Sequence, residues 1–397
     1  MMAGAICFVF FILFVAQKRR YSKNFARLFA LLLVYSVILV FTCEKQGFLF
    51  SVAMLILMKD VDMNRNVYKI SFIVGLIFLF IACYLSRHGG EVIRFINGEW
   101  RTIMKRSNIL YVSFTAVTCL YLLIKKNNLF FRHILCILIS SYLMYLYAGA
   151  RTGFVSMLVL VFSLIILRSE YISRLKFVRY SCILSPAICA GVSWLSAFKY
   201  GDSLILIWLD KLVQGRIYQG NYFLNLYDIK LFGQPIYESG NSDDYYVLDS
   251  AYLDMLICEG ALFFVLWVFV NKAVIKYMYD NNRMIEVAIL IMYSVYGICE
   301  TFLPNCFLNI SWFLYGEYLY ARIKWYRLWQ LKMKTKIRNY SPLIKSILLT
   351  NEQLTEDMLV SRGKIYTFLN PVSYLTALKD ESLFLSLIHI WRCRRAI

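Results

Sequence analysis

Charged residues and prolines are scarce in this chain of 397 residues, and each shortage excludes a structural class of protein. Only 17% of the residues are charged and 60% are hydrophobic, whereas soluble domains have about 25% charged residues. With only five prolines, long disordered segments are not indicated. The chain is therefore not a soluble globular protein, and the composition predicts an all-α fold, a polytopic helical bundle within a membrane.

The sequence also has few residues suited to metal or nucleotide chemistry. It contains three histidines, none in a His-x-x-His pattern, and its eleven cysteines include no Cys-x-x-Cys pair. Most cysteines lie in or beside apolar runs, where they serve as small packing residues. Glycine-rich phosphate loops are absent as well. We therefore predict no metal and no cofactor, and an ATP-driven pump or a nicotinamide enzyme is not indicated.

Long apolar runs are what the chain has in abundance, and they predict about eleven membrane helices. Some runs are shorter than the ~20 residues that a bilayer core requires. The predicted spans are 3–16, 28–43, 48–58, 70–86, 109–124, 133–149, 153–167, 181–198, 251–270, 284–300 and 307–321.

The formal charge of +19 would suggest nucleic acid in a soluble protein, but in a membrane protein basic residues report topology. Placing the loop 17–27 in the cytoplasm puts 25 basic residues inside and 11 outside, as the positive-inside rule requires. The two long loops, 87–108 and 199–250, then lie outside. Within the second loop, Leu204–Val213 is amphipathic and is expected to lie along the membrane interface.

Two arginines on the outer side could bind an anion. Arg151 stands between two apolar runs among small residues, and Arg216 stands in the loop 199–250. The guanidinium group presents a planar fork of donors that matches phosphate oxygens, so the pair could hold a diphosphate. The alternatives are that Arg151 reaches toward the lipid headgroups and that Arg216 is a solvated loop residue.

Two carboxylates are expected on the same side. Asp249 precedes an apolar run that we predict to continue as a helix through Gly260, so it could cap that helix with Ser250 or accept a proton from a sugar hydroxyl. Glu300 ends another predicted helix and is either a solvated helix end or a second carboxylate of the site. The aromatic surfaces of Tyr218, Tyr222 and Tyr252 would suit sugar rings, although tyrosine is common at membrane interfaces.

Three ordered motifs carry a resemblance to a known family. They are Ala148-Gly-Ala-Arg-Thr-Gly-Phe154, Gly215-Arg-Ile-Tyr-Gln-Gly-Asn-Tyr-Phe223 and Val247-Leu-Asp-Ser-Ala-Tyr252. Together with the segment from Glu300 to Asn309, this set resembles the Wzy-type oligosaccharide repeat-unit polymerases of O-antigen, capsule and exopolysaccharide assembly, and more distantly the O-antigen ligases. The likeness covers roughly residues 1–338.

The resemblance implies a membrane glycosyltransferase that polymerises undecaprenyl-diphosphate-linked saccharides at the outer face of the bacterial cytoplasmic membrane. It assigns the diphosphate to Arg151 and Arg216 and the acceptor's base to Asp249 first and Glu300 second. Implied partners are the lipid-linked saccharide, membrane lipid, and a flippase and a chain-length regulator of the same pathway, with no nucleic acid. Ligase-like relatives use a histidine in the outer loop, and the loop 199–250 has none.

The tail differs in composition from the membrane region. Residues 339–385 form a soluble mixture, of which about 358–385 resemble the start of a WecB/TagA/CpsF-type glycosyltransferase, and residues 386–397 resemble translated sequencing-adapter read-through.

Two other functions compete with the polymerase. A lipid-linked oligosaccharide flippase or transporter would need ionisable residues within the membrane, and Asp254 and Glu259 are the best candidates for that role. A ligase-like transferase would differ from a polymerase in the length distribution of its products.

Overall fold

The computed structural model of the protein describes residues 23–59, 61, 65–88, 91–96, 99–104, 107–126, 128–236, 239–241 and 244–321. The chain divides into two units, Met1–Ala321 and Arg322–Ile397. The predicted span 3–16, the boundary after residue 338 and both interpretations of the tail lie outside the described residues.

Seven of the described helices are long and apolar enough to cross a membrane, so the prediction of a helical membrane bundle is confirmed at that level. They are α2 (Lys23–Cys43), α4 (Arg65–His88), α5 (Ser107–Lys125), α6 (Phe131–Ala148), α7 (Arg151–Arg168), α9 (Lys176–Phe198) and α13 (Ala261–Asp280). Two further apolar helices, α3 (Gly47–Leu57) and α14 (Met284–Tyr296), are shorter. The number of eleven spans stays a prediction.

Apolar side chains on the outward surfaces of these helices fit a lipid environment. On α4, Ile73, Val74, Ile77 and Phe80 are between 47% and 71% exposed, as is Phe78. A contiguous apolar surface of this kind is rare on a soluble monomer, whereas hydrocarbon chains cover it at little cost.

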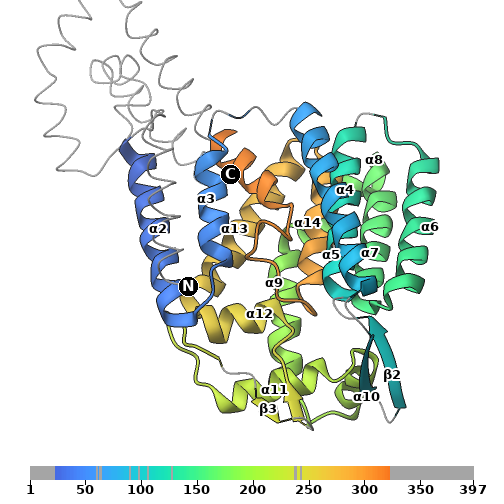
Figure 1. Ribbon diagram of the computed structural model, residues 1–397. Helices are drawn as coiled ribbons and strands as arrows, with labels where there is room; N and C mark the ends of the chain where they lie inside the picture. The colour runs from blue at the N-terminus through green and yellow to red at the C-terminus, as the bar shows by residue number, and fades with distance from the viewer. Residues whose placement is uncertain are drawn as a thin grey trace, which may run out of the picture. The chain divides into compact units, whose positions relative to one another are not determined.

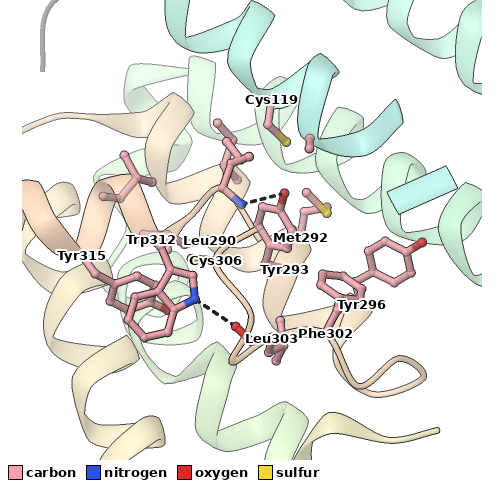
Figure 2. Packing of buried hydrophobic residues seen from close by; sticks show 14 of the residues in the cluster. Cys119, Leu290, Met292, Tyr293, Tyr296, Phe302, Leu303, Cys306, Trp312 and Tyr315 are labelled. Atoms are coloured by element: carbon pink, nitrogen blue, oxygen red, sulfur yellow. Dashed lines mark hydrogen bonds between the residues drawn. The ribbon is translucent and has the colours of Figure 1, made fainter. Parts of the chain in front are cut away.

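Helix α14 lies at the centre of the bundle, where it packs against α5, α7, α9 and α13. It ends at Tyr296, and a non-helical segment follows before helix resumes at residues 312–321. Figure 2 shows how this segment is fixed: the Trp312 indole N–H donates to the Leu303 carbonyl at 3.2 Å, and the Ile310 N–H donates to the Tyr293 hydroxyl at 3.4 Å. The segment carrying Glu300 is therefore held by the core.

The predicted span 251–270 is wrong as one continuous helix. Helix α12 (Ala251–Asp254) continues as a π-helical turn, η1 (Met255–Glu259), and stops at Gly260, which has φ of +99°. The long helix α13 begins only at Ala261. An isolated glycine is tolerated within helices, so the apolar pattern alone could not locate the break.

A segment of the predicted outer loop 199–250 is held against this break by hydrogen bonds. The N–H groups of Ala261 and Leu262 donate to the carbonyls of Lys230 and Leu231 at 3.0 and 3.2 Å. The N–H of Gln234 donates to the Cys258 carbonyl at 2.9 Å. These three bonds satisfy backbone groups that the interrupted helix leaves without internal partners.

The two predicted outer loops contain regular structure, of which the sequence pattern indicated only the amphipathic stretch Leu204–Val213. The first forms the antiparallel hairpin β1 (Glu91–Ile96) and β2 (Glu99–Met104). The second forms two helices, α10 (Leu204–Leu212) and α11 (Arg216–Leu226), and a short hairpin of β3 (Ser239–Asn241) and β4 (Asp244–Tyr246). Helix α8 itself (Glu170–Ser173) belongs to the link between α7 and α9. In Figure 1, α10, α11 and β2 lie at the same end of the bundle.

Candidate functional site

The carboxylate of Glu300 is the meeting point of three parts of the chain. Its Oε1 accepts hydrogen bonds from Arg216 Nη2 and from Thr152 Oγ1, both at 3.1 Å. Its Oε2 accepts a longer bond from Asn108 Nδ2 at 3.4 Å. The starts of α5, α7 and α11 therefore converge on Glu300, whose side chain is only 10% exposed.

Arg216 joins the two carboxylates that the sequence offered as alternatives. Its Nε lies 3.4 Å from Asp249 Oδ2, and its Nη2 binds Glu300. Its Nη1 donates to the Cys299 carbonyl. All three nitrogens of the guanidinium group therefore have a protein partner, and the side chain is 11% exposed.

Asp210 fixes the position of Arg216. The carboxylate of Asp210, on α10, accepts from the N–H groups of Ile217 and Tyr218 at 2.8 and 3.1 Å. A carboxylate that caps the first turn of a helix satisfies free N–H donors and complements the helix dipole. Gly215, with φ of +82°, makes the turn that brings α10 back to this position. Asp210 thus orients the helix that begins with Arg216.

The electrostatics of the site follow from one cation between two acids. Burial raises the pKa of Glu300, an effect that Arg216 opposes and that Asp249 reinforces. A proton on Glu300 would leave Arg216 and Asp249 as a balanced ion pair. Because Asp249 is 32% exposed, it is the carboxylate that an incoming group can reach.

Arg151 lies beside this cluster but is not part of it. Helix α6 ends at Ala148, Gly149 adopts φ of +70°, and α7 begins with Arg151 itself, so the small residues do interrupt the helix as predicted. The Arg151 side chain is exposed, and within the described part of the chain no ion pair to it is found. The next residue, Thr152, binds Glu300. An exposed arginine therefore begins α7, one residue before the Thr152 that binds Glu300, at a helix N-terminus where the dipole favours anions.

The three predicted sugar-binding tyrosines differ in accessibility. Tyr218 is 40% exposed and Tyr222 is half-buried, both on α11. Tyr252 is 1% exposed, and its hydroxyl donates to the Ser294 carbonyl at 2.8 Å. Because Tyr252 is packed in the core, we no longer assign a sugar contact to it. Likewise Ser250 is the N-cap residue of α12, but its hydroxyl makes no capping bond.

Three residues of the site were missed from the sequence: Asn108, Thr152 and Asp210. Thr152 and Asn108 could have been considered because they border predicted outer loops, but neutral side chains give no charge signal. The buried position of Asp210 follows from the packing of α10 on α11, which no local pattern encodes.

Replacing Thr152 by valine should destabilise the protein by about 1–3 kcal/mol, because a buried carboxylate loses a donor while the shape is kept. Thermal unfolding in detergent measures this. Thr118→Val is the matched control, since the Thr118 hydroxyl donates to the Phe114 carbonyl of its own helix and to no other group of the described residues. Equal melting temperatures for the two variants would contradict a structural contribution of the bond from Thr152 to Glu300.

Comparisons with known proteins give no further guide. No family model matches the chain, and searches of curated proteins and of solved structures return no match. Among the described residues, no group of three or more His, Cys, Asp and Glu side chains is placed to hold a metal ion.

Proposed function

We propose that this protein is a membrane glycosyltransferase that polymerises oligosaccharide repeat units carried on undecaprenyl diphosphate, at the outer face of the bacterial cytoplasmic membrane, for capsule or exopolysaccharide. The observation that carries the proposal is the cluster of Arg216, Asp249 and Glu300 with the accessible Arg151 at its edge. It combines an accessible carboxylate with a cation at one end of a membrane helical bundle. The resemblance of the motifs to Wzy-type polymerases supports a lipid-linked saccharide as the substrate. The membrane domain would have about eleven spans.

The roles of the two arginines separate in this proposal. Since the guanidinium nitrogens of Arg216 are occupied, Arg216 positions Asp249 and Glu300 and is not the main anion ligand. Arg151 and the first N–H groups of α7 would bind the diphosphate, where positive charge stabilises the departing group. The sequence-based pairing of both arginines on one diphosphate is thereby revised.

The reaction moves one proton and one electron pair. The acceptor hydroxyl oxygen bonds to the anomeric carbon of the donor, and the bond from that carbon to the diphosphate oxygen breaks. The electron pair leaves with the diphosphate beside Arg151, and the proton passes to Asp249. While Asp249 is ionised, a proton on Glu300, whose pKa is raised by burial, keeps the cluster balanced. When Asp249 takes the acceptor's proton, loss of the proton from Glu300 restores that balance.

Helix α10 supports a substrate carried by lipid. Its apolar side chains Leu204, Ile205, Trp208 and Leu212 are 56% to 85% exposed, while Asp210 on the other face is buried. Such a helix fits the plane of the membrane interface, as the amphipathic pattern predicted. Asp210 of this helix accepts from the backbone N–H of Ile217, next to Arg216, so α10 connects the membrane interface with the site.

Replacing Arg151 by alanine should abolish the polymer without unfolding the protein, because Arg151 is exposed. The test is complementation of a polymerase-deleted, polysaccharide-producing strain with the full chain, reading the length of the lipid-linked product on a gel. We expect a ladder from the wild type and single repeat units from Arg151→Ala at equal protein level. The control is Arg174→Ala, whose side chain is 81% exposed and, among the described residues, forms an ion pair with Glu170 alone.

Two outcomes would count against the proposal. A full ladder from Arg151→Ala would remove Arg151 from the site, and single units from the wild type would contradict the polymerase for that repeat unit. A ligase-like transferase would instead transfer finished chains without changing their length. A transporter remains the second candidate because of one observation, the buried pair Asp254 and Glu259.

A further inference from the structure

Glu259 is a buried acid that the proposed reaction does not use. It is the last residue of η1, directly before the helix break at Gly260, and it is 3% exposed. Among the described residues, its Oε2 is fully buried and has no hydrogen-bond partner. Burying an ionised carboxylate costs free energy unless a cation or hydrogen-bond donors pair with it, so the protonation state of Glu259 needs an explanation.

The surroundings of Glu259 already contain a matched ion pair. Lys45, in the link between α2 and α3, contacts the Asp254 carboxylate of α12. The other titratable groups that face Glu259 are Tyr35 and Cys43 of α2. Cys43 is itself engaged, because its Sγ donates to the Cys258 carbonyl at 2.7 Å. No second cation is found near Glu259 within the described residues.

The balance of charges around Glu259 therefore decides whether this carboxyl group is protonated. The positive charge of Lys45 balances Asp254, and an ionised Glu259 would add one uncompensated negative charge to the interior. Leaving a buried charge unpaired strongly destabilises the folded state. A proton removes that charge without any change of shape, so the protonated acid is the favoured form.

We propose that Glu259 is a proton-binding site at the helix break, occupied while Lys45 is paired with Asp254. Lys45 is 41% exposed and Asp254 is 6% exposed, so Lys45 links the surface to the buried acids. The segment Lys230–Gln234, fastened over the break, closes the other side. The inference does not depend on the polymerase, since a buried proton site is compatible with either candidate function.

Ionisation of Glu259 is expected to loosen the break. A negative charge beside Gly260 would attract water and would compete with Asp254 for the positive charge of Lys45. The three backbone bonds between the segment Lys230–Gln234 and the break would then be exposed to competing water. The site thereby links proton binding to the closure of the outer loop over α13.

The test is infrared difference spectroscopy of the full chain in lipid nanodiscs, titrated from about pH 5 to pH 9, a range that lies above the ordinary carboxyl pKa of about 4. The signal is the C=O stretch of a protonated carboxyl group. We expect a component of this signal to persist at neutral pH in the wild type and to be lost in Glu259→Gln, so that it appears in the difference between the two proteins. The control is Glu170→Gln, because the Glu170 side chain is 87% exposed.

A second variant tests the role of the ion pair. In Asp254→Asn the negative neighbour is gone and Lys45 is free to pair with Glu259, so the midpoint of the Glu259 signal should move down by one pH unit or more. Thermal unfolding gives an independent readout: Glu259→Gln should be at least as stable as the wild type at neutral pH, because glutamine mimics the neutral acid. At high pH, the wild type alone should lose stability.

Each alternative result would overturn the proposal. A neutral-pH carboxyl signal of the same intensity in the wild type and in Glu259→Gln would show that Glu259 does not hold the proton. A Glu259→Gln variant that fails to fold, or that melts well below the wild type, would show that the native state needs the ionised carboxylate. An unchanged midpoint in Asp254→Asn would show that the ion pair does not control the proton.

Discussion

Replacing Arg216 by alanine should both abolish the polymer and lower the free energy of unfolding by about 3–5 kcal/mol. The stability loss arises because Glu300 and Asp249 would face each other without a cation, and Glu300 is nearly buried. The activity loss arises because the accessible carboxylate loses the group that positions it. Thermal unfolding in detergent and the length of the lipid-linked product measure the two effects.

A double variant separates folding from chemistry. Combining Arg216→Ala with Glu300→Gln removes the buried negative charge along with the positive one, so most of the stability should return. The polymer should not return, since Asp249 remains without its positioning partner. Arg179→Ala is the control for removing a surface arginine, because Arg179 and Asp280 are 47% and 40% exposed and such pairs contribute only about 0–1 kcal/mol.

The stability loss of Arg216→Ala should depend on pH in a definite direction. Burial raises the pKa of Glu300 in the folded protein. A raised pKa means that the ionised form destabilises the fold: the penalty is absent below the unfolded pKa of about 4 and grows as the pH rises above it. The variant should therefore approach wild-type stability in acid. A loss that is the same at low and neutral pH would contradict an unpaired Glu300 as its cause.

The membrane helices could be predicted because their signal is local. Runs such as 133–149 and 181–198 are apolar over a length that suits a bilayer, and helices α6 and α9 occupy them. The helix break at Gly260 could not be predicted, because it depends on the backbone of Leu231 and Gly233, far away in the sequence. Local patterns report composition and period, whereas a break that is completed by another segment is a tertiary property.

The candidate site was predictable only in outline. The topology predicted from the positive-inside rule put Arg216, Asp249 and Glu300 on one side of the membrane, and the structure brings their side chains together. The sequence could not show that Arg216 forms ion pairs with Asp249 and Glu300 whereas Arg151 does not. That distinction depends on side-chain contacts. Nor could it show that Tyr252 is in the core, because a tyrosine beside an apolar run suits an interface equally well.

Substituting alanine for Gly260 or Gly233 should unfold the region around the helix break, with a loss of several kcal/mol. Both residues have left-handed backbone conformations, with φ of +99° and +79°. A Cβ on Gly260 would collide with backbone atoms of Leu231 and Gly233, and a Cβ on Gly233 would collide with the Cys258 carbonyl. These neighbours are backbone atoms held by hydrogen bonds, so they cannot move aside as a flexible side chain would.

Alanine substitutions at two other glycines distinguish the cost of backbone strain from the cost of a steric collision. Gly201 also has a positive φ, of +97°, but a Cβ there would meet nothing within 4 Å, so Gly201→Ala should cost only about 1–2 kcal/mol of strain. Gly191 lies within α9, likewise in open space, and Gly191→Ala should be neutral or stabilise the helix by about 0.5–1 kcal/mol. The order of melting temperatures should therefore be Gly191→Ala highest, then Gly201→Ala, then the two variants at the break.

The same variants connect the break to function. If the segment Lys230–Gln234 must be seated on Gly260 for Arg216 and Asp249 to meet, then Gly260→Ala should lose the polymer ladder at a temperature where the protein is still folded. Hydrogen exchange of the Ala261 and Leu262 amides, which donate to that segment, should rise in the same variant. Unchanged exchange at these two amides, with a melting temperature equal to that of Gly201→Ala, would mean that the close approach of the two glycines contributes no stability beyond backbone strain.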